Sequence, residues 1–493
     1  MTVGISTREW QAVRAIVRDK LQFEAFRPGQ QEALRAVLAG NDTLAVLPTG
    51  SGKSAVYQIA GMMIPGPTVI VSPLIALQRD QCASIERNEL GEVALVNSMQ
   101  RAGERERALR DLETDDLEFL LLAPEQFNNP ETLERVKAAK PSLFVVDEAH
   151  CVSEWGHSFR PDYLRLGAVI DALGHPRTLA LTATASPDVR REICERLHLR
   201  SPTVVVAGFD RPNIHLSVRC VTGERLKQQI LLELLRDVSL PGIVYVATRK
   251  HAEGVAQALV GAGHRAVAYH AGLKRDDRNA RQAAFMNDEA DIMVATSAFG
   301  MGVDKADVRF VFHYDVSDSL DSYYQEIGRA GRDGDSARAT LLFSDRDLNL
   351  KRFFAAGGRL SAEEVQQIIR ALSAVREAPT MRDLARQAAL SLTKTNSAVA
   401  RLEDEGVVHR SANGAISLSS LPRNLNARVV SAVEAQHDLR EAHRARLEPL
   451  QHFARTRDCR RALLLDYFGD RIDHECAGCD NCDLARGASK PAA

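Results

Sequence analysis

A segment of small residues follows an apolar run near the start of the sequence. The run 43–47 (TLAVL) leads into Pro48-Thr49-Gly50-Ser51-Gly52-Lys53-Ser54. Glycines let backbone N–H groups approach a phosphate, Lys53 can reach the β- and γ-phosphates, and Ser54 can ligate Mg²⁺. The alternative is a chance glycine-rich turn. We predict a nucleotide-phosphate site made of Thr49, Gly50, Ser51, Gly52, Lys53 and Ser54.

Two adjacent carboxylates follow a second apolar run. The run 143–146 (LFVV) ends in Asp147-Glu148-Ala149-His150. A buried strand would deliver both carboxylates to the carboxyl edge of a sheet, where ligands bind in α/β folds. We expect Asp147 to hold Mg²⁺ and Glu148 to polarise the attacking water as a general base. Otherwise, acidic residues in the first turn of a helix would explain the pair.

Two arginines stand among small residues in the segment 322–334 (SYYQEIGRAGRDG). Arg329 and Arg332 could come close to a γ-phosphate and neutralise charge in the transition state, with Gln325 nearby. The alternative is a solvated helix face. These three residues complete our predicted catalytic set with Lys53 and the two carboxylates.

Four of the eight cysteines cluster near the end of the chain, with the spacing C-x16-C-x2-C-x2-C. Thiolates at this spacing suit tetrahedral Zn²⁺, and a closed site of four thiolates would be structural. Free reduced cysteines and an iron–sulfur cluster are the alternatives. The expected metal ligands are Cys459, Cys476, Cys479 and Cys482.

Length and composition place the chain among ordinary globular proteins. Its 493 residues predict about three domains. Lys and Arg total 63 against 65 Asp and Glu, so the net charge of -2 neither indicates nor excludes nucleic-acid binding. The sequence has no apolar window long enough for a membrane span and no apolar signal core at its start. Isolated cysteines elsewhere read as reduced thiols, which favours a cytoplasmic protein.

The strand-like runs predict two α/β lobes, each with a buried parallel sheet. The expected strands are 43–47, 69–72, 119–123, 143–146 and 178–182 in the first lobe, then 243–246, 266–269, 292–295 and 309–313 in the second. Two such lobes in tandem create a cleft, which is a common ligand location.

The character of the sequence changes from about residue 357. Helices are expected at 361–375, 380–390 and 394–405, and Asn413-Gly414 predicts a hairpin, so that the segment reads as a winged helix. Residues 430–469 again look helical. The expected parts are lobe 1 at 1–205, lobe 2 at 206–355, the winged-helix-like insertion at 356–425, the zinc-binding subdomain at 426–484 and a flexible tail at 485–493.

The run from Ala149 to Leu166 (AHCVSEWGHSFRPDYLRL) resembles the aromatic-rich loop of RecQ-type DNA helicases of superfamily 2. Its aromatic and basic side chains suit stacking on single-stranded DNA and contacts with its backbone. Aromatic core filling is the alternative. The DNA-binding candidates in this run are Trp155, His157, Phe159 and Arg160.

Other segments resemble further motifs of the family, in family order. The segment 26–30 (FRPGQ) is similar to the adenine-reading motif, which implies adenine contacts by Phe23, Arg27 and Gln30. Segments 71–81, 245–249, 269–273 and 295–305 resemble strand-contacting motifs that grip phosphates without reading sequence. The resemblance implies DNA contacts by Ser72, Thr248, Arg249, His270 and Thr296. The segment Thr182-Ala183-Thr184 resembles the motif that links hydrolysis to lobe movement.

The resemblance implies two RecA-like lobes and an ATP-dependent DNA helicase with ATP, Mg²⁺ and structural Zn²⁺, acting 3′ to 5′ in DNA repair and recombination. The expected partners are single-stranded and duplex DNA, and the expected form is a monomer of the short bacterial type without an HRDC domain. An RNA helicase or a duplex translocase is the runner-up, and a non-catalytic DNA-binding regulator the third interpretation. Seven arginines between 440 and 461 predict a face for duplex DNA or an exposed helix with ion pairs.

Overall fold

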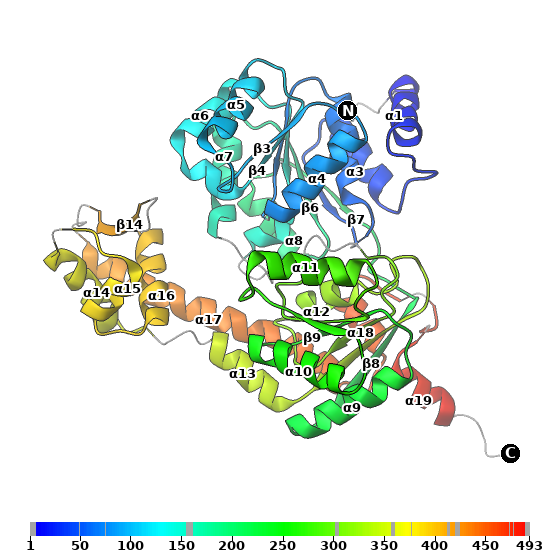
Figure 1. Ribbon diagram of the computed structural model, residues 1–493. Coiled ribbons are helices and arrows are strands. Elements are labelled where there is room, and N and C mark those ends of the chain that lie inside the picture. The colour runs from blue at the N-terminus through cyan, green and yellow to red at the C-terminus, as the bar shows by residue number, and fades with distance from the viewer. Residues whose placement is uncertain are drawn as a thin grey trace. The chain divides into compact units, whose positions relative to one another are not determined.

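The computed structural model describes the chain apart from residues 1–5, 49, 74, 154–160, 301–304, 356–359, 376, 412–414, 420–423, 473, 477 and 489–493. The chain forms two compact units (Figure 1). The first unit joins Met1–Ser344 to Leu450–Ala493, and the second is Asp345–Pro449. The first unit therefore holds the first expected lobe, the second expected lobe up to Ser344, and the cysteine-rich end of the chain.

Lobe 1 is built on a seven-stranded sheet in the order β3-β4-β2-β5-β6-β1-β7, and every pair in it is parallel. All five predicted strands are present. The strands are β1 (Thr43–Val46), β2 (Thr68–Val71), β3 (Val93–Val96), β4 (Phe119–Leu122), β5 (Leu143–Val146), β6 (Arg177–Thr182) and β7 (Thr203–Val206).

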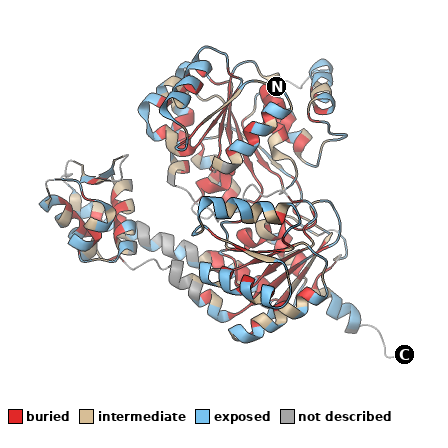
Figure 2. Cartoon of the chain, viewed as in Figure 1, coloured by how far each residue is buried: buried red, intermediate tan, exposed pale blue. Residues whose placement is uncertain are grey.

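Helices cover both faces of this sheet, and the strands in its centre are buried (Figures 1 and 2). Residues of the first three helices pack against one face through Ala45, Ile70 and Val145. The helices are α1 (Thr7–Asp19), α2 (Gln30–Leu38), α3 (Lys53–Met63), α4 (Ile75–Arg87), α5 (Ala102–Glu113), α6 (Pro130–Ala138), α7 (Leu166–Ala172) and α8 (Pro187–Arg196). Short 3-10 helices are Pro124–Asn128, Ala149–Val152 and Pro161–Arg165.

Lobe 2 is also built on a parallel sheet, which has six strands in the order β10-β11-β9-β12-β13-β8. Its four predicted strands are confirmed within one residue at their ends. The elements are β8 (Ile214–Cys220), α9 (Glu224–Arg236), β9 (Gly242–Tyr245), α10 (Arg249–Gly261), β10 (Ala266–Tyr269), α11 (Arg275–Met286), β11 (Ile292–Ala295), β12 (Phe310–His313), α12 (Leu320–Ile327) and β13 (Ala337–Phe343).

The cysteine-rich end of the chain covers the open edge of lobe 2, where β8 has no neighbouring strand. The Leu216 N–H donates to the Gly478 carbonyl at 3.2 Å, and the Val218 N–H donates to the Asp480 carboxylate at 2.9 Å. Helices α18 (Arg460–Tyr467) and α19 (Asp480–Ala488) flank this contact. Helix α19 therefore continues through the first four residues of the expected flexible tail.

The same end of the chain packs against the linker between the lobes, residues 207–213. The Phe209 ring stacks on Phe468 with centroids 4.6 Å apart, and the Phe209 N–H donates to Asp470 at 2.8 Å. Arg190 of lobe 1 lies over the Phe209 ring and donates to the Phe468 carbonyl. The turn after α18 thus contacts lobe 1 and the linker together.

In the second unit, helices α14, α15 and α16 and a two-stranded antiparallel sheet pack around one core, as the winged-helix interpretation predicted. Its elements are α13 (Asp345–Ala355), α14 (Ala362–Ala374), α15 (Met381–Gln387), α16 (Leu392–Asp404), β14 (Val408–Arg410) and β15 (Ile416–Leu418). The predicted turn at Asn413-Gly414 lies outside the described residues. The 31-residue helix α17 (Leu425–Arg455) then carries the chain back to the first unit.

The expected basic face at 440–461 needs correction. Arg446, Arg460 and Arg461 are buried, so they cannot form an exposed surface for duplex DNA. Arg460 instead pairs with Asp480 at 2.6 Å. Among the described helices, none is long and apolar enough to cross a membrane.

Arg461 provides a test of how the end of the chain docks on lobe 2. Its guanidinium donates to Asp210 at 2.5 Å and to the carbonyls of Arg211 and Ile214 at 2.8 and 2.6 Å. Arg461→Ala leaves two carbonyls without this donor, whereas Asp210 keeps His474 at 3.3 Å, so we expect a loss of about 2–4 kcal/mol in the free energy of unfolding. Urea denaturation followed by intrinsic fluorescence measures it. Arg457→Ala, at an exposed position, is the control, and equal midpoints for both variants would contradict this role.

Candidate functional site

The glycine-rich segment forms a tight loop between β1 and α3. Gly50 and Gly52 have φ of +79° and +73°, in the left-handed region that favours glycine. A Cβ on Gly52 would lie 2.7 Å from the Gln30 Nε2 atom, so a side chain there would displace the Gln30 amide. Helix α3 begins at Lys53, and its first N–H groups have no partner within the helix. This arrangement suits a phosphate, as predicted. Thr49 lies outside the described residues.

Gln30 and Arg27 hold this loop from the side of α2. The Gln30 amide donates to the carbonyls of Ser51 and Gly52 at 2.7 and 2.9 Å and accepts from the Arg27 N–H at 2.8 Å. Arg27 also donates to the Gly50 carbonyl. Both ends of the Gln30 amide are therefore engaged with protein, and adenine reading by Gln30 stays a prediction. Phe23, 40% exposed, lines the same pocket.

The two carboxylates lie at the end of β5, as predicted, and both are buried. The Asp147 carboxylate accepts from the Glu148 N–H at 3.0 Å and from the Gln81 amide at 2.8 Å. Burial, followed by the Glu148 charge, raises the Asp147 pKa to about 6. Glu148 has φ of +50°, a strained value for a residue with a Cβ and one that is concentrated at functional sites.

Lys53 faces these carboxylates from the loop. Its pKa is lowered, mainly by burial and also by the Arg332 charge, whereas Glu148 and Asp147 act in the opposite sense. Its ammonium donates to the Leu47 carbonyl at 3.4 Å. A partly buried cation that lines an open cavity is suited to an anionic ligand.

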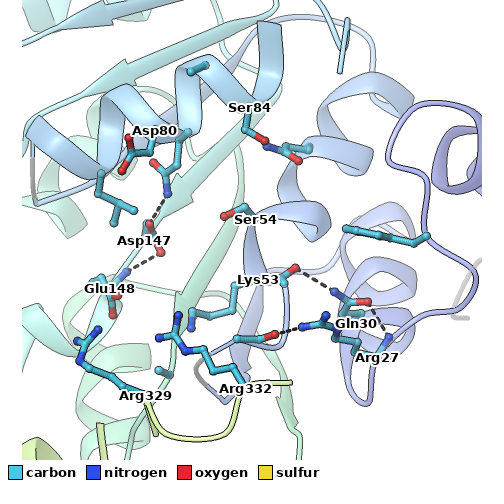
Figure 3. Close-up of a pocket in the computed structure, with 18 of the residues that line it drawn as sticks. Arg27, Gln30, Lys53, Ser54, Asp80, Ser84, Asp147, Glu148, Arg329 and Arg332 are labelled. Atoms are coloured by element: carbon cyan, nitrogen blue, oxygen red, sulfur yellow. Dashed lines mark hydrogen bonds between the residues drawn. The ribbon is translucent and has the colours of Figure 1, made fainter. Parts of the chain in front are cut away.

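The predicted arginines of lobe 2 come to the same pocket. Arg329, Arg332 and Gln325 line a cavity of about 1050 Å³ together with Lys53 and Glu148 (Figure 3). Gly300 permits this approach, because a Cβ there would lie 2.6 Å from an Arg329 guanidinium nitrogen. Among the described residues the Arg329 Nε and the Ser51 hydroxyl have no hydrogen-bond partner, although both are buried. These polar atoms fit a bound polyphosphate.

Hydrogen bonds join the segment around the two carboxylates to other predicted motifs. The His150 ring nitrogen lies 2.9 Å from the Thr182 hydroxyl, and the Tyr163 hydroxyl donates to the Asp147 carbonyl at 3.0 Å. Tyr163 lies near the end of the aromatic-rich run 149–166. Trp155, His157, Phe159 and Arg160 of that loop lie outside the described residues. Sequence reasoning missed Gln81 and Tyr163 as neighbours of Asp147, because nothing in their local pattern indicates a partner so far along the chain.

The remaining DNA-binding candidates lie away from the cavity, directly after strands. Each follows the carboxyl end of a parallel strand: Ser72 after β2, Thr248 and Arg249 after β9, His270 after β10 and Thr296 after β11. Arg249 is exposed and Thr248 caps α10 by accepting from the His251 N–H at 3.1 Å. Ser72 and His270 are buried, and His270 contacts Glu253 at 2.9 Å. Their contact with DNA stays a prediction.

The four predicted metal ligands come together. The sulfur atoms of Cys459, Cys476, Cys479 and Cys482 all lie within 4.8 Å of one another. Four thiolates around Zn²⁺ at about 2.3 Å would be separated by about 3.8 Å, so the cluster fits a tetrahedral ion after small side-chain shifts. Cys459 begins α18, and the others flank the start of α19.

Comparisons with known proteins agree with this geometry. Three family models match: DEAD/DEAH box helicase at residues 27–193, helicase conserved C-terminal domain at 226–334, and RecQ zinc-binding at 422–483. The probable ATP-dependent DNA helicase RecS of Bacillus subtilis is 36% identical over 455 residues, which cover 92% of this chain and 87% of RecS. The chain belongs to the RecQ-type DNA helicases.

Other RecQ-type relatives are longer than this chain. The ATP-dependent DNA helicase RecQ of Bacillus subtilis is 41% identical over 333 residues, which cover 67% of this chain and 56% of that protein. Among solved structures, helicase Lhr of Mycobacterium smegmatis, bound to ssDNA and AMP-PNP, aligns with a TM-score of 0.53 and 19% identity over 86% of this chain and 62% of Lhr. Dbp5 of S. cerevisiae, bound to RNA and ADP–BeF3, aligns with a TM-score of 0.54 and 17% identity over 71% of this chain and 92% of Dbp5. These likenesses show the two-lobe fold.

The zinc site gives a direct prediction. Cys479 is buried in the cluster, so Cys479→Ser should remove a thiolate that the ion needs and reduce the zinc content from about one equivalent to well below it. Elemental analysis of the purified protein measures the content, and thermal unfolding should show a lower midpoint. The control is Cys220→Ser at an exposed cysteine outside the cluster. Unchanged zinc in Cys479→Ser would contradict the ligand assignment.

Proposed function

We propose that this RecQ-type helicase uses ATP hydrolysis to move 3′ to 5′ along single-stranded DNA and unwind duplex DNA in repair and recombination. The observation that carries the proposal is the cavity in which the phosphate loop of lobe 1 faces Arg329 and Arg332 of lobe 2 (Figure 3). A triphosphate bound there would contact both lobes. Its hydrolysis would remove contacts that favour the closed arrangement.

Each residue of the cavity then has a role that follows from its position. Lys53 and the loop N–H groups bind the β- and γ-phosphates, and Arg329 and Arg332 offset the charge that develops on the transferred group. Glu148 accepts a proton from the attacking water, which Gln325 helps to orient. Ser54 and Asp147 would hold Mg²⁺, which when bound offsets phosphate charge. Phe23, Arg27 and Gln30 are proposed for the adenine side of the pocket.

Coupling to DNA is supported by the contacts around Asp147. Tyr163 ties the end of the aromatic-rich loop to the backbone of that carboxylate, and His150 ties the 3-10 helix after it to Thr182. We propose that single-stranded DNA binds Trp155, His157, Phe159 and Arg160 and is gripped by the residues that follow the strands of both lobes: Ser72, Thr248, Arg249, His270 and Thr296. A shift in the loop would then reach the hydrolytic site through short contacts.

The second unit and the cysteine-rich end complete the proposed organisation. We retain the division into lobe 1 (1–205), lobe 2 (206–355), insertion (356–425), zinc-binding subdomain (426–484) and tail (485–493) as functional parts of a monomer. Duplex binding by the insertion would need exposed positive charge on α16, yet Lys394 there already pairs with Glu364. Four zinc thiolates and isolated reduced cysteines favour action in the cytoplasm.

The first test is ATP hydrolysis measured without nucleic acid and with single-stranded DNA, duplex DNA or RNA. We expect strong stimulation by single-stranded DNA and a loss of hydrolysis in Lys53→Ala, because the phosphates lose the cation of the phosphate loop. Lys137→Ala, exposed on α6, is the control. Stimulation by RNA or blunt duplex alone would instead favour an RNA helicase or duplex translocase, and no hydrolysis at all would favour a non-catalytic regulator.

A substitution of Arg329 distinguishes a role in the chemical step from a role in ATP binding. Arg329→Ala should lower kcat by about 10³- to 10⁵-fold, because the transition state loses a cation, with a much smaller change in the KM for ATP. Steady-state kinetics with saturating single-stranded DNA measure both constants. Arg338→Ala, exposed on β13, should keep both within about twofold of the unchanged protein. A rise in KM at constant kcat would assign Arg329 to ground-state binding instead.

A further inference from the structure

One buried amide in the cavity belongs to no role described so far. Gln81 is 5% exposed and lies on α4, whose residues Leu77, Asp80, Gln81 and Ser84 line the cavity. Their spacing of three and four residues places them on one face of the helix. Helix α4 therefore turns one face toward the site, and Gln81 is the residue on it that contacts Asp147.

The contact joins Gln81 to the carboxylate proposed to hold Mg²⁺. The Gln81 Nε2 donates to the Asp147 Oδ2 at 2.8 Å, shown by the dashed line that reaches Asp147 from α4 in Figure 3. The other oxygen of the same carboxylate accepts from the Glu148 N–H at 3.0 Å. With one donor on each oxygen, the plane of the carboxylate is fixed before any ion arrives.

A purely structural role explains Gln81 poorly. Buried side-chain amides in folded proteins normally satisfy both their donor and their acceptor. The Gln81 Oε1 atom is buried and, among the residues that the structure describes, has no hydrogen-bond partner. The bond to Asp147 is therefore retained although half of the amide goes unsatisfied.

Gln78, one turn earlier on the same helix, shows the contrast. Its amide donates to the Ser72 carbonyl at 2.8 Å and accepts from the Asn97 amide at 3.1 Å, so both of its ends are satisfied. It is fully buried and takes no part in the cavity. The helix thus carries one glutamine with the bonding expected of a structural residue and one directed to the carboxylate.

We propose that Gln81 is a positioning residue for the divalent ion: it orients the Asp147 carboxylate through Nε2 and so sets the affinity of the nucleotide site for Mg²⁺. This inference rests on the proposed ATP hydrolysis at the same site. Gln81 touches neither nucleotide nor ion in this role. Its effect is confined to the metal-dependent part of nucleotide binding.

Gln81→Met tests the proposal, because methionine keeps the length of the side chain and removes the donor. Binding of a fluorescent ADP analogue is measured by titration in EDTA and then at increasing Mg²⁺. We expect unchanged affinity in EDTA and an increase of about 10- to 100-fold in the Mg²⁺ concentration needed for half of the metal-dependent gain. The same shift should be found in the Mg²⁺ dependence of ATP hydrolysis, with the KM for ATP nearly unchanged at saturating Mg²⁺.

Gln78→Met is the matched control, because it makes the same change in the same helix without touching Asp147. It should leave the Mg²⁺ half-point in place even if it lowers the thermal midpoint. Gln81→Asn, which shortens the side chain by one methylene, is the second variant if Gln81→Met does not fold, and it should show the same shift.

The outcomes separate this inference from the proposed function. If the unchanged protein binds the nucleotide with a Mg²⁺-dependent gain and Gln81→Met has the same half-point, the positioning role is overturned and the ATPase stands. An equal shift in Gln78→Met also overturns it, because packing of α4 would then be the cause. If the unchanged protein shows neither nucleotide binding nor hydrolysis, the proposed function itself fails.

Discussion

The hydrogen-bond register of the parallel strands in lobe 1 is the constraint on which the site depends. Val46 of β1 aligns with Thr182 of β6, and Val146 of β5 aligns with Ala180 of the same strand. The chain after each strand continues this bonding, since the Leu47 N–H donates to the Thr182 carbonyl and the Asp147 N–H to the Val71 carbonyl, both at 2.9 Å. A slip of one residue would displace a carboxylate by about 3.3 Å and turn it to the other face. The sheet, and not a loop, therefore sets the distance between the phosphate loop and Asp147.

The cavity gathers charged side chains of both signs before any ligand binds. Asp147, Glu148 and Arg329 are buried before a ligand is present, and Lys53 is partly buried beside them. The pKa shifts of Lys53 and Asp147 are both dominated by burial. Such a cluster is costly for stability unless groups of opposite sign face one another, as they do here. Because these charged groups already have little contact with water, little solvent reorganisation is needed when a triphosphate binds. Gln81 and the Glu148 N–H extend the same preparation to the orientation of one carboxylate.

The sequence predicted the parts whose signal is local. The five continuous apolar strands of lobe 1, the glycine-rich loop and the cysteine spacing all depend on adjacent residues. Strands β3, β7, β8 and β13 were missed: β7 and β8 alternate between more and less buried positions instead of being buried on both faces, β3 is a partly exposed edge strand, and β13 begins with a polar Ala-Arg-Ala segment. The burial of Arg461 could not be foreseen, because its acceptor Asp210 lies 251 positions away in the sequence. The contact of Gln81 with Asp147 could not be foreseen for the same reason, since the two residues are 66 positions apart.

The cysteine-rich end of the chain covers the free edge of β8, and this contact has a consequence for synthesis on the ribosome. Strand β8 can pair with β13 once lobe 2 has been made, but its other edge is covered by residues such as Arg461, Gly478 and Asp480, which are translated much later. At an elongation rate of about 5–20 residues per second, the two segments leave the ribosome about 10–50 s apart. During that interval the nascent chain carries an open strand edge, of the kind that recruits other strands. Chaperone occupancy and solubility during expression should therefore depend on the last thirty or so residues, although these lie far from the nucleotide.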